Sequence, residues 1–266
     1  MPANTTAIQL RESVAAGTQA CAASGDTWQS TILGHMADRK DEWIKRIVPG
    51  RSFMDVGGLW GTTNEKITVA LNAGATRATM ADIAPLDHAL WNDFDRHCAS
   101  MGINNYAKAR LDITAPGPAA ATLQHDVIHC SGIIYHLPDP YTILANLRQL
   151  TKEQLILTSM VVPECIKNKV GTLSFPADHA AFVPSLTDAT RKIVAEHFRA
   201  ANISVGGITQ PMEEPWLWPD GKPNFGPWWW LMSPVFLRSM IKVAGLKVED
   251  ECWSWEGLSY SFLLHV

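Results

Sequence analysis

Short apolar runs alternate along the chain with stretches of mixed polarity, which is the pattern of an α/β protein. The run at residues 53–56 is apolar without clean alternation, as expected of a strand that is covered on both faces. Further strands are expected at residues 78–83, 106–111, 126–131 and 155–162. Segments expected to be helical lie between them, at residues 64–72, 86–101 and 141–149. This order predicts an open, doubly wound sheet of mostly parallel strands.

The first apolar run ends in an acid and then breaks into glycine. Residues 52–61 read S-F-M-D-V-G-G-L-W-G. Gly57, Gly58 and Gly61 allow the backbone to turn sharply and to approach a ligand closely. Because a helical segment follows, the stretch predicts a strand, a glycine turn and a helix N-terminus, which together form the nucleotide-binding corner of an open α/β sheet.

The spacing of these glycines does not match two common nucleotide motifs. The pattern G-x-G-x-x-G fails from Gly57 and from Gly58, and the phosphate loop requires a Gly-Lys pair that is absent here. The arrangement Asp55-x-Gly57-x-x-x-Gly61 instead resembles motif I of the class I S-adenosylmethionine-dependent methyltransferases, usually [DE]-x-G-x-G-x-G. Leu59 stands where the middle glycine of that motif is usual. Taken alone, the motif leaves open a glycine-rich turn of some other α/β protein.

Further acids follow the second and third apolar runs. Asp82 lies 27 residues after Asp55, the length of one β-α-β unit, and is placed to accept hydrogen bonds from both ribose hydroxyls of a nucleoside. Its neighbour Ile83 is counted with it as a cofactor-binding candidate. Asp112 can accept from the exocyclic amino group of adenine, and Ile113 can pack on the ring. An ordinary surface acid is the alternative interpretation of Asp112.

The run after the fourth strand makes the resemblance more specific. Residues 126–140 read D-V-I-H-C-S-G-I-I-Y-H-L-P-D-P, which is similar to the motif after strand four in small-molecule class I methyltransferases. It is also similar to that of the tRNA wobble-uridine carboxymethyltransferase relatives. Ser131 and Gly132 are therefore expected to contact the cofactor. The signals occur in the family's order over residues 52–162, whereas residues 163–230 match poorly.

The resemblance implies a Rossmann-like, doubly wound, seven-stranded α/β sheet with an antiparallel C-terminal hairpin and an inserted substrate cover. The hairpin is expected from residues 246–253 and 258–266. The expected division is an N-terminal helical segment or lid, a core in two pieces, and an insertion over the substrate site: residues 1–50, 51–162 with 231–266, and 163–230. The N-terminal segment either packs on the sheet edge or covers the cofactor.

Few residues are expected to take part directly in the chemistry. In methyl transfer from a sulfonium the cofactor supplies the activated methyl group, so positioning and desolvation matter most. His136, after strand four, is the candidate general base, and Tyr135 is a weaker neighbouring candidate. Packing or capping of the following turn is the alternative role for His136. Glu164 is a further, weaker candidate.

Substrate contacts are expected from aromatic residues and one histidine outside the core, namely Trp28, His179, Trp229 and Trp230. The tryptophans near residue 229 belong to a Pro/Trp-rich stretch that either forms a local core or offers a stacking wall to a planar acceptor. No metal is expected, because the positions after strands four and five lack clustered Asp and Asn ligands. The [DNS]-P-P-[YFW] motif of the methyltransferases that act on DNA amines is absent as well.

Net charge, cysteine usage and the N-terminal sequence limit the kinds of partner and the cellular compartment that are expected. The net charge of −4 and a pI near 6.1 argue against a nucleic-acid partner. Five cysteines without a C-x-x-C motif indicate reduced thiols in a cytoplasmic protein. The N-terminus lacks signal-peptide features, and no apolar run is long enough to span a membrane.

Three functions remain open from the sequence. The first is S-adenosylmethionine-dependent methyl transfer to an O, N or C nucleophile of a small molecule, with a secondary metabolite as one option and S-adenosylhomocysteine as the product. The second is an RNA-modifying methyltransferase. The third is a catalytically silent S-adenosylmethionine-binding protein that works through a partner. Whichever function holds, the protein is expected to be a monomer or a homodimer. The acceptor and the methylated atom cannot be named from the sequence.

Overall fold

The computed structural model describes residues 39–117, 122–203, 207–209 and 215–266. These residues form two compact units. The larger unit holds the described residues up to Ile134, together with Asp139–Ser159 and Arg238–Val266. The smaller unit holds Tyr135–Pro138 and the described part of Met160–Leu237.

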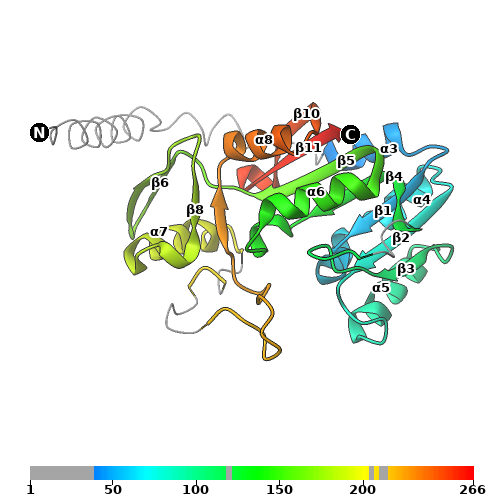
Figure 1. Cartoon of the computed structure of the whole chain (residues 1–266), viewed down its shortest axis with the longest axis horizontal. Helices are drawn as coiled ribbons and strands as arrows, with labels where there is room; N and C mark the ends of the chain where they lie inside the picture. The colour runs from blue at the N-terminus through cyan, green and yellow to red at the C-terminus, as the bar shows by residue number, and fades with distance from the viewer. Residues whose placement is uncertain (1–38, 118–121, 204–206, 210–214) are drawn as a thin grey trace, which may run out of the picture. The chain divides into compact units, whose positions relative to one another are not determined.

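The larger unit is built on a seven-stranded sheet in the order β10-β11-β5-β4-β1-β2-β3 (Figure 1). Its strands are β1 (Ser52–Val56), β2 (Arg77–Asp82), β3 (Ala107–Arg110), β4 (His125–Ser131), β5 (Thr151–Met160), β10 (Lys247–Ser254) and β11 (Ser259–His265). β1 pairs in parallel with β2 and β4, whereas β10 and β11 form an antiparallel pair. The predicted fold class and the C-terminal hairpin are therefore confirmed. β5 begins at Thr151, earlier than the predicted start.

Helices of the larger unit connect these strands. They are α3 (Arg39–Ile47), the 3-10 helix η1 (Gly58–Asn64), α4 (Ile67–Asn72), α5 (Ala89–Ser100), α6 (Pro140–Leu150) and the short turn η5 (Trp255–Gly257). Two elements belong partly to each unit, namely the short turn η3 (Ile134–His136) and the helix α8 (Pro234–Val243). α6 begins where the sequence favours it, since Asp139 accepts a hydrogen bond from the Thr142 N–H and Pro140 occupies the first turn. None of the described helices is long and apolar enough to cross a bilayer.

The core of the larger unit fills with side chains from the sheet and from the helices beside it. All five residues of β1 are buried, as expected of a central parallel strand. Phe53, Trp91 and Phe94 are among the largest fully buried side chains. Trp43 of α3 joins the same cluster, so α3 is part of the core. The N-terminal residues for which a lid was predicted lie mostly outside the described part of the chain.

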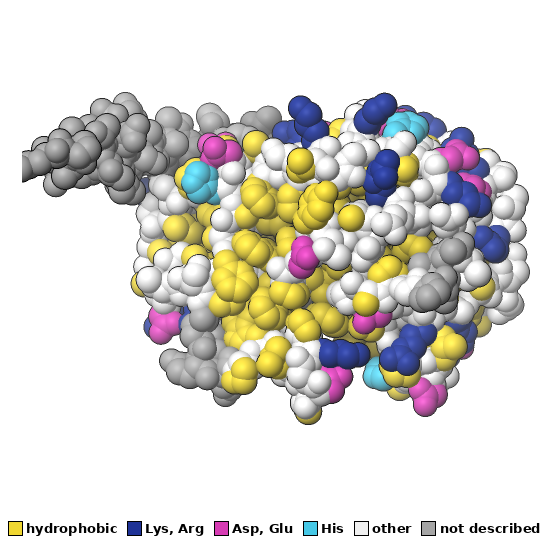
Figure 2. Space-filling model, in the orientation of Figure 1, with side chains coloured by type: hydrophobic (Ala, Val, Ile, Leu, Met, Phe, Trp, Pro, Cys, Tyr) yellow, Lys and Arg dark blue, Asp and Glu magenta, His cyan; other side chains and the backbone are white. Residues whose placement is uncertain are grey.

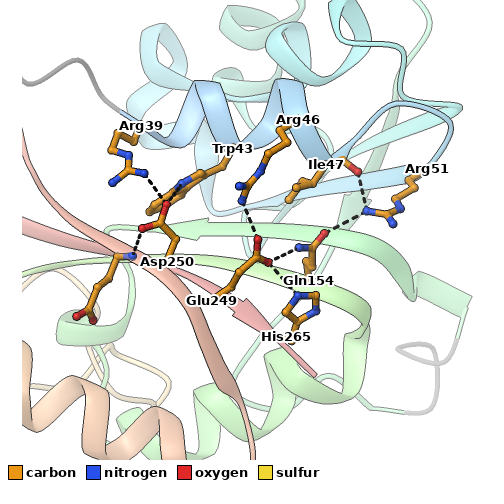
Figure 3. A network of polar contacts seen from close by, with 10 residues as sticks. Arg39, Trp43, Arg46, Ile47, Arg51, Gln154, Glu249, Asp250 and His265 are labelled. Atoms are coloured by element: carbon orange, nitrogen blue, oxygen red, sulfur yellow. Dashed lines mark hydrogen bonds and ion pairs between the residues drawn. The ribbon is translucent and has the colours of Figure 1, made fainter.

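Polar contacts also connect α3 to the edge strand β10 (Figure 3). The carboxylate of Asp250 accepts from Arg39 at 2.6 Å and from the Trp43 indole N–H at 3.0 Å. Arg46 donates to Glu249 at 2.8 Å. The strand register shifts between Val248 and Asp250, so Glu249 is the extra residue of a β-bulge.

Glu249 gathers contacts from three other elements of the sheet region (Figure 3). Besides Arg46 of α3, its carboxylate accepts from Gln154 of β5 at 2.8 Å and lies 2.9 Å from Nε2 of His265 at the end of β11. These contacts connect residues that are far apart in sequence. The network therefore fixes α3 against the C-terminal hairpin as well as against the apolar core.

The smaller unit contains more strand than the sequence indicated. Its elements are the antiparallel pair β6 (Cys165–Asn168) and β7 (Gly171–Ser174), the antiparallel pair β8 (Ala180–Phe182) and β9 (Trp230–Met232), the turn η4 (Val183–Ser185), and α7 (Asp188–Arg199). These strands were not predicted. Each is only three or four residues long, which is too short to show the alternation of a strand.

The cysteines depart from the expectation of reduced thiols at one position. Cys98, Cys130 and Cys252 are free and buried. Cys165 is disulfide-bonded, so the expectation is wrong for this residue.

Candidate active site

The glycine turn follows β1 and packs tightly on its own surroundings. Gly57 has a φ of 80°, and a Cβ atom there would lie 2.1 Å from Cδ1 of Ile133. At Gly58 a Cβ atom would lie 2.7 Å from Cε of Met80 and 2.8 Å from Oδ2 of Asp55. The positive φ of Gly57 favours glycine there, and a Cβ atom at either position would force a neighbouring side chain to move.

Leu59 occupies the position of the motif's middle glycine in the sequence, but it has a different structural role. Its side chain is 1% exposed and belongs to the hydrophobic core of the larger unit. It is therefore part of the packing of η1, the 3-10 helix that leads from the turn toward α4. Gly61, further along η1, has open space where a Cβ atom would be. Sequence reasoning expected the turn to pass directly into the helix and missed this 3-10 segment.

Asp82 lies at the end of β2 with its carboxylate 3% exposed. Oδ1 accepts from the Ala84 N–H at 2.9 Å, and the backbone N–H groups of Leu59 and Ile83 also donate to the carboxylate. Burial raises the pKa of Asp82, those hydrogen bonds lower it, and the nearby charge of Asp55 adds to the rise.

The third acid follows β3. Asp112 is half-buried, and its Oδ1 accepts from the backbone N–H and the hydroxyl of Thr114 at 3.0 and 2.6 Å. Ile113 is buried, and its carbonyl accepts from the side chain of Asn146 in α6 at 2.8 Å. The local turn thus fixes the orientation of the Asp112 carboxylate.

Ser131 and Gly132 follow at the end of β4. Both are half-buried, and Gly132 has a φ of 77° and donates its N–H to the Thr158 carbonyl at 3.1 Å. β4, β1, β2 and β3 are consecutive in the sheet, so all the predicted cofactor residues lie at or just after the carboxyl ends of neighbouring strands. Because the connections from β1 and from β4 lead away from each other, this edge is the topological switch point where such sheets bind ligands.

His136 belongs to the smaller unit. Its Nδ1 donates to the Pro227 carbonyl at 3.0 Å, which leaves the lone pair on Nε2. Burial lowers the pKa of His136, although hydrogen bonds to the backbone partly offset the shift. The imidazole is therefore neutral near pH 7 and can accept a proton at Nε2.

Tyr135 is buried in a small aromatic cluster. Its ring centroid lies 4.3 Å from that of His136 and 4.6 Å from that of Trp228, which in turn contacts Phe198 at 4.9 Å. Burial raises the pKa of the Tyr135 hydroxyl. The hydroxyl therefore stays protonated at neutral pH and is better suited to donating a hydrogen bond than to acting as a base.

The two tryptophans predicted to contact substrate are half-buried and anchored by their indole N–H groups. Trp229 donates to the Asn224 carbonyl at 2.8 Å, and Trp230 donates to the Pro138 carbonyl at 3.1 Å. The ring centroid of Phe182 lies 5.1 Å from that of Trp230 and 6.0 Å from that of Trp229. These contacts hold the proline-rich segment together and leave part of each indole exposed.

The remaining predicted residues are dispersed. His179 is exposed, and its Nδ1 lies 2.7 Å from the neighbouring Asp178 carboxylate. Glu164 is exposed. Trp28 lies outside the described residues. Within the part of the chain that the structure describes, no group of three or more His, Cys, Asp or Glu side chains could hold a metal ion.

One polar contact at this edge was missed by sequence reasoning. His129 in β4 lies 2.7 Å from Oδ1 of Asp55, and the two residues are Cα partners in the parallel register. A histidine inside an apolar strand run gives little signal of its own. The available signal was that two polar residues interrupt two apolar runs expected to be neighbouring strands.

The glycine turn gives a matched pair of substitutions. We expect Gly58→Ala to destabilise the protein by about 1–3 kcal/mol, because the added methyl group would overpack against Asp55 and Met80. Gly61→Ala is the control and should change the free energy of unfolding by less than about 0.5 kcal/mol, since its Cβ atom meets open space. Urea unfolding of both variants measures the difference. Equal stabilities would contradict the tight packing of the turn on Asp55.

Comparisons with known proteins show likeness in structure only. No protein-family model matches the chain, and no curated protein matches it in sequence. Magnesium protoporphyrin IX methyltransferase (ChlM) from Synechocystis PCC 6803, with bound SAH, is 16% identical with a TM-score of 0.50, over 89% of this chain and 82% of that chain. The trans-methyltransferase CalH, in complex with SAH, is 16% identical with a TM-score of 0.53, over 85% of this chain and 54% of CalH. This chain thus spans about half the length of CalH.

A third similar structure carries a different name. A Rhodobacter sphaeroides protein assigned by name to the Zn-dependent alcohol dehydrogenases is 13% identical with a TM-score of 0.54, over 86% of this chain and 89% of that chain. At such identities the likeness concerns the fold. Together with the strand order and the C-terminal hairpin, it shows that the chain has the fold of the class I S-adenosylmethionine-dependent methyltransferases.

Proposed function

We propose that the protein binds S-adenosylmethionine and transfers its methyl group to a small molecule, with S-adenosylhomocysteine as the product. The observation that carries the proposal is the series of acids at neighbouring strand ends, Asp55, Asp82 and Asp112, with the tight glycine turn between the first strand and its helix. Two structures of similar fold hold SAH, which supports the same ligand here.

A nicotinamide cofactor is the main rival, because one similar structure is named a dehydrogenase. The glycine spacing counts against it, since G-x-G-x-x-G is not met from Gly57 or Gly58. The described residues also include no group of three or more His, Cys, Asp or Glu side chains that could bind zinc. The proposal therefore contains no metal-dependent step.

The chain's own residues have four tasks in this proposal. The bound cofactor supplies an activated methyl group on a sulfonium. The glycine turn admits the amino acid part of the cofactor, Asp82 accepts from the ribose hydroxyls, and Asp112 accepts from the adenine amino group. His136 takes a proton from the acceptor at Nε2, because its Nδ1 is engaged by the Pro227 carbonyl.

A small-molecule acceptor is favoured over a nucleic acid. The chain is acidic overall, and Figure 2 shows Lys and Arg side chains interspersed with Asp and Glu. A phosphate backbone is usually bound by a continuous basic surface. The exposed parts of Trp229 and Trp230 are suited to stacking on a planar acceptor. The free, buried thiols of Cys98, Cys130 and Cys252 support a cytoplasmic location, whereas the disulfide at Cys165 counts against it.

Calorimetric titration of the purified chain tests the cofactor. S-adenosylmethionine and S-adenosylhomocysteine are expected to bind with dissociation constants in the micromolar range, and NAD is expected not to bind. Binding of NAD alone, or of none of the three ligands, would overturn the proposal.

The acceptor class is tested by labelled methyl transfer into fractionated cell extract. Label in small molecules supports the proposal. Label in RNA would support an RNA-modifying enzyme, and binding without transfer to any fraction would indicate a silent binding protein.

A further inference from the structure

A buried histidine forms a hydrogen bond with the acid that precedes the glycine turn. His129 of β4 is 3% exposed and Asp55 of β1 is 1% exposed, and Nδ1 of His129 lies 2.7 Å from Oδ1 of Asp55. Because an ionised carboxylate only accepts hydrogen bonds, Nδ1 is the donor. The second ring nitrogen, Nε2, is also buried and has no hydrogen-bond partner among the described residues.

The other carboxylate oxygen of Asp55 connects the turn to the following helix. Oδ2 accepts from the backbone N–H of Lys66, the residue before α4, at 2.8 Å. The same oxygen would lie 2.8 Å from a Cβ atom at Gly58. The Lys66 side chain forms an ion pair with Asp41 of α3 at 2.7 Å. One carboxylate thus fixes β1, the glycine turn and the start of α4 relative to one another.

A buried carboxylate of this kind depends on its second partner. With the Lys66 N–H alone, one oxygen of Asp55 would be desolvated without a hydrogen bond, and the carboxylate could rotate about its Cβ–Cγ bond. The hydrogen bond from His129 satisfies that oxygen and fixes the plane of the carboxylate.

We infer that His129 is a positioning residue for cofactor binding, which it supports by holding the Asp55 carboxylate where it keeps the glycine turn and the start of α4 in place. The inference rests on the proposed function and deepens it, because it assigns a role to a residue that does not itself touch the cofactor. His129 performs this role through the hydrogen bond from its Nδ1 to the Asp55 carboxylate.

Two substitutions separate this role from simple packing. His129→Asn keeps a side-chain N–H that can donate to Asp55, whereas His129→Leu fills similar space without a donor. We expect the leucine variant to bind S-adenosylhomocysteine about 10–100-fold more weakly, the usual effect of losing a hydrogen bond to a buried charge. The asparagine variant should bind close to the parent chain. Calorimetric titration, corrected for the folded fraction found by circular dichroism, measures both.

The possible outcomes distinguish a failure of this inference from a failure of the proposed function. If the parent chain binds neither adenosyl ligand, the proposed function fails and the inference fails with it. If the parent binds and the folded leucine variant binds equally well, the inference alone is overturned. Equal weakening in both variants would also overturn it, because the hydrogen bond would then not be the cause. Should the leucine variant fail to fold, His129→Met, which also lacks a donor, tests the same contact, and an affinity equal to that of the parent chain would overturn the inference.

Discussion

Replacing Asp82 with alanine is expected to weaken the binding of S-adenosylmethionine and S-adenosylhomocysteine about 100-fold or more. Two ribose hydroxyls would each lose a hydrogen bond to a charged acceptor, and each such bond contributes about 1.5–3 kcal/mol. The carboxylate is buried at the end of β2, where water cannot replace it easily. Calorimetric titration with both ligands measures the loss.

Asp82→Asn is the matched control for the fold. Its side-chain oxygen can still accept from the Ala84 N–H, so the backbone around the strand end keeps a partner. We expect the asparagine variant to unfold close to the parent chain while it still loses the charged acceptor. An unchanged affinity in the folded alanine variant would remove Asp82 from the cofactor site.

Binding should also weaken in mild acid. The pKa of Asp82 is raised above its usual value, chiefly by burial, so its carboxylate becomes protonated at a higher pH than an exposed aspartate does. The protonated form is a poorer acceptor for ribose hydroxyls. Affinity is therefore expected to fall as the pH drops through this raised pKa, and the Asp82→Asn variant should lack this pH dependence.

The second large effect is expected at His136. Replacing it with asparagine should lower kcat by about 10²–10⁴-fold with little change in cofactor affinity, because general base catalysis contributes about that much. The asparagine amide can still donate to the Pro227 carbonyl, which holds the side chain in place, but it offers no basic nitrogen. Turnover of the acceptor fraction found by labelled methyl transfer, measured at saturating cofactor, provides the readout.

The pH profile distinguishes a base from a packing residue at this position. Burial lowers the pKa of His136, so the imidazole is neutral and active above that pKa and becomes protonated below it. The rate for the parent chain should therefore fall on the acid side, at a pH below the usual range of histidine. The asparagine variant should lose this acid limb. A variant with unchanged kcat would assign His136 to packing against Tyr135 and Trp228.

The central sheet was predictable because its strands have a strong local signal. A central strand that is buried on both faces is rich in apolar residues, as Phe53, Met54 and Val56 of β1 and Val127 and Ile128 of β4 show. The acids at the ends of β1, β2 and β3 were found for the same reason, since a charged residue directly after an apolar run is conspicuous. Their order along the chain then fixes which strand ends lie side by side.

Other features depend on contacts that no local pattern encodes. The strands of the β6–β7 and β8–β9 pairs are only three or four residues long, which is too short to show the period of a strand. Leu59 appeared to be a defect in a glycine motif, but its side chain is buried in the core. The contact between His129 and Asp55 joins residues 74 positions apart and could be inferred only after the strand register was known.

The bulge at Glu249 has a consequence for how copies of this chain meet one another. β10 is an edge strand of the main sheet, and an edge strand presents unpaired backbone groups that can recruit a strand from another molecule. The bulge breaks the regular spacing of those groups, and Glu249, Asp250 and Glu251 add charge there. The opposite edge, β3, is only four residues long and carries Lys108 and Arg110. Both ends of the sheet thus discourage aggregation by strand addition, and any homodimer is expected to form through another surface.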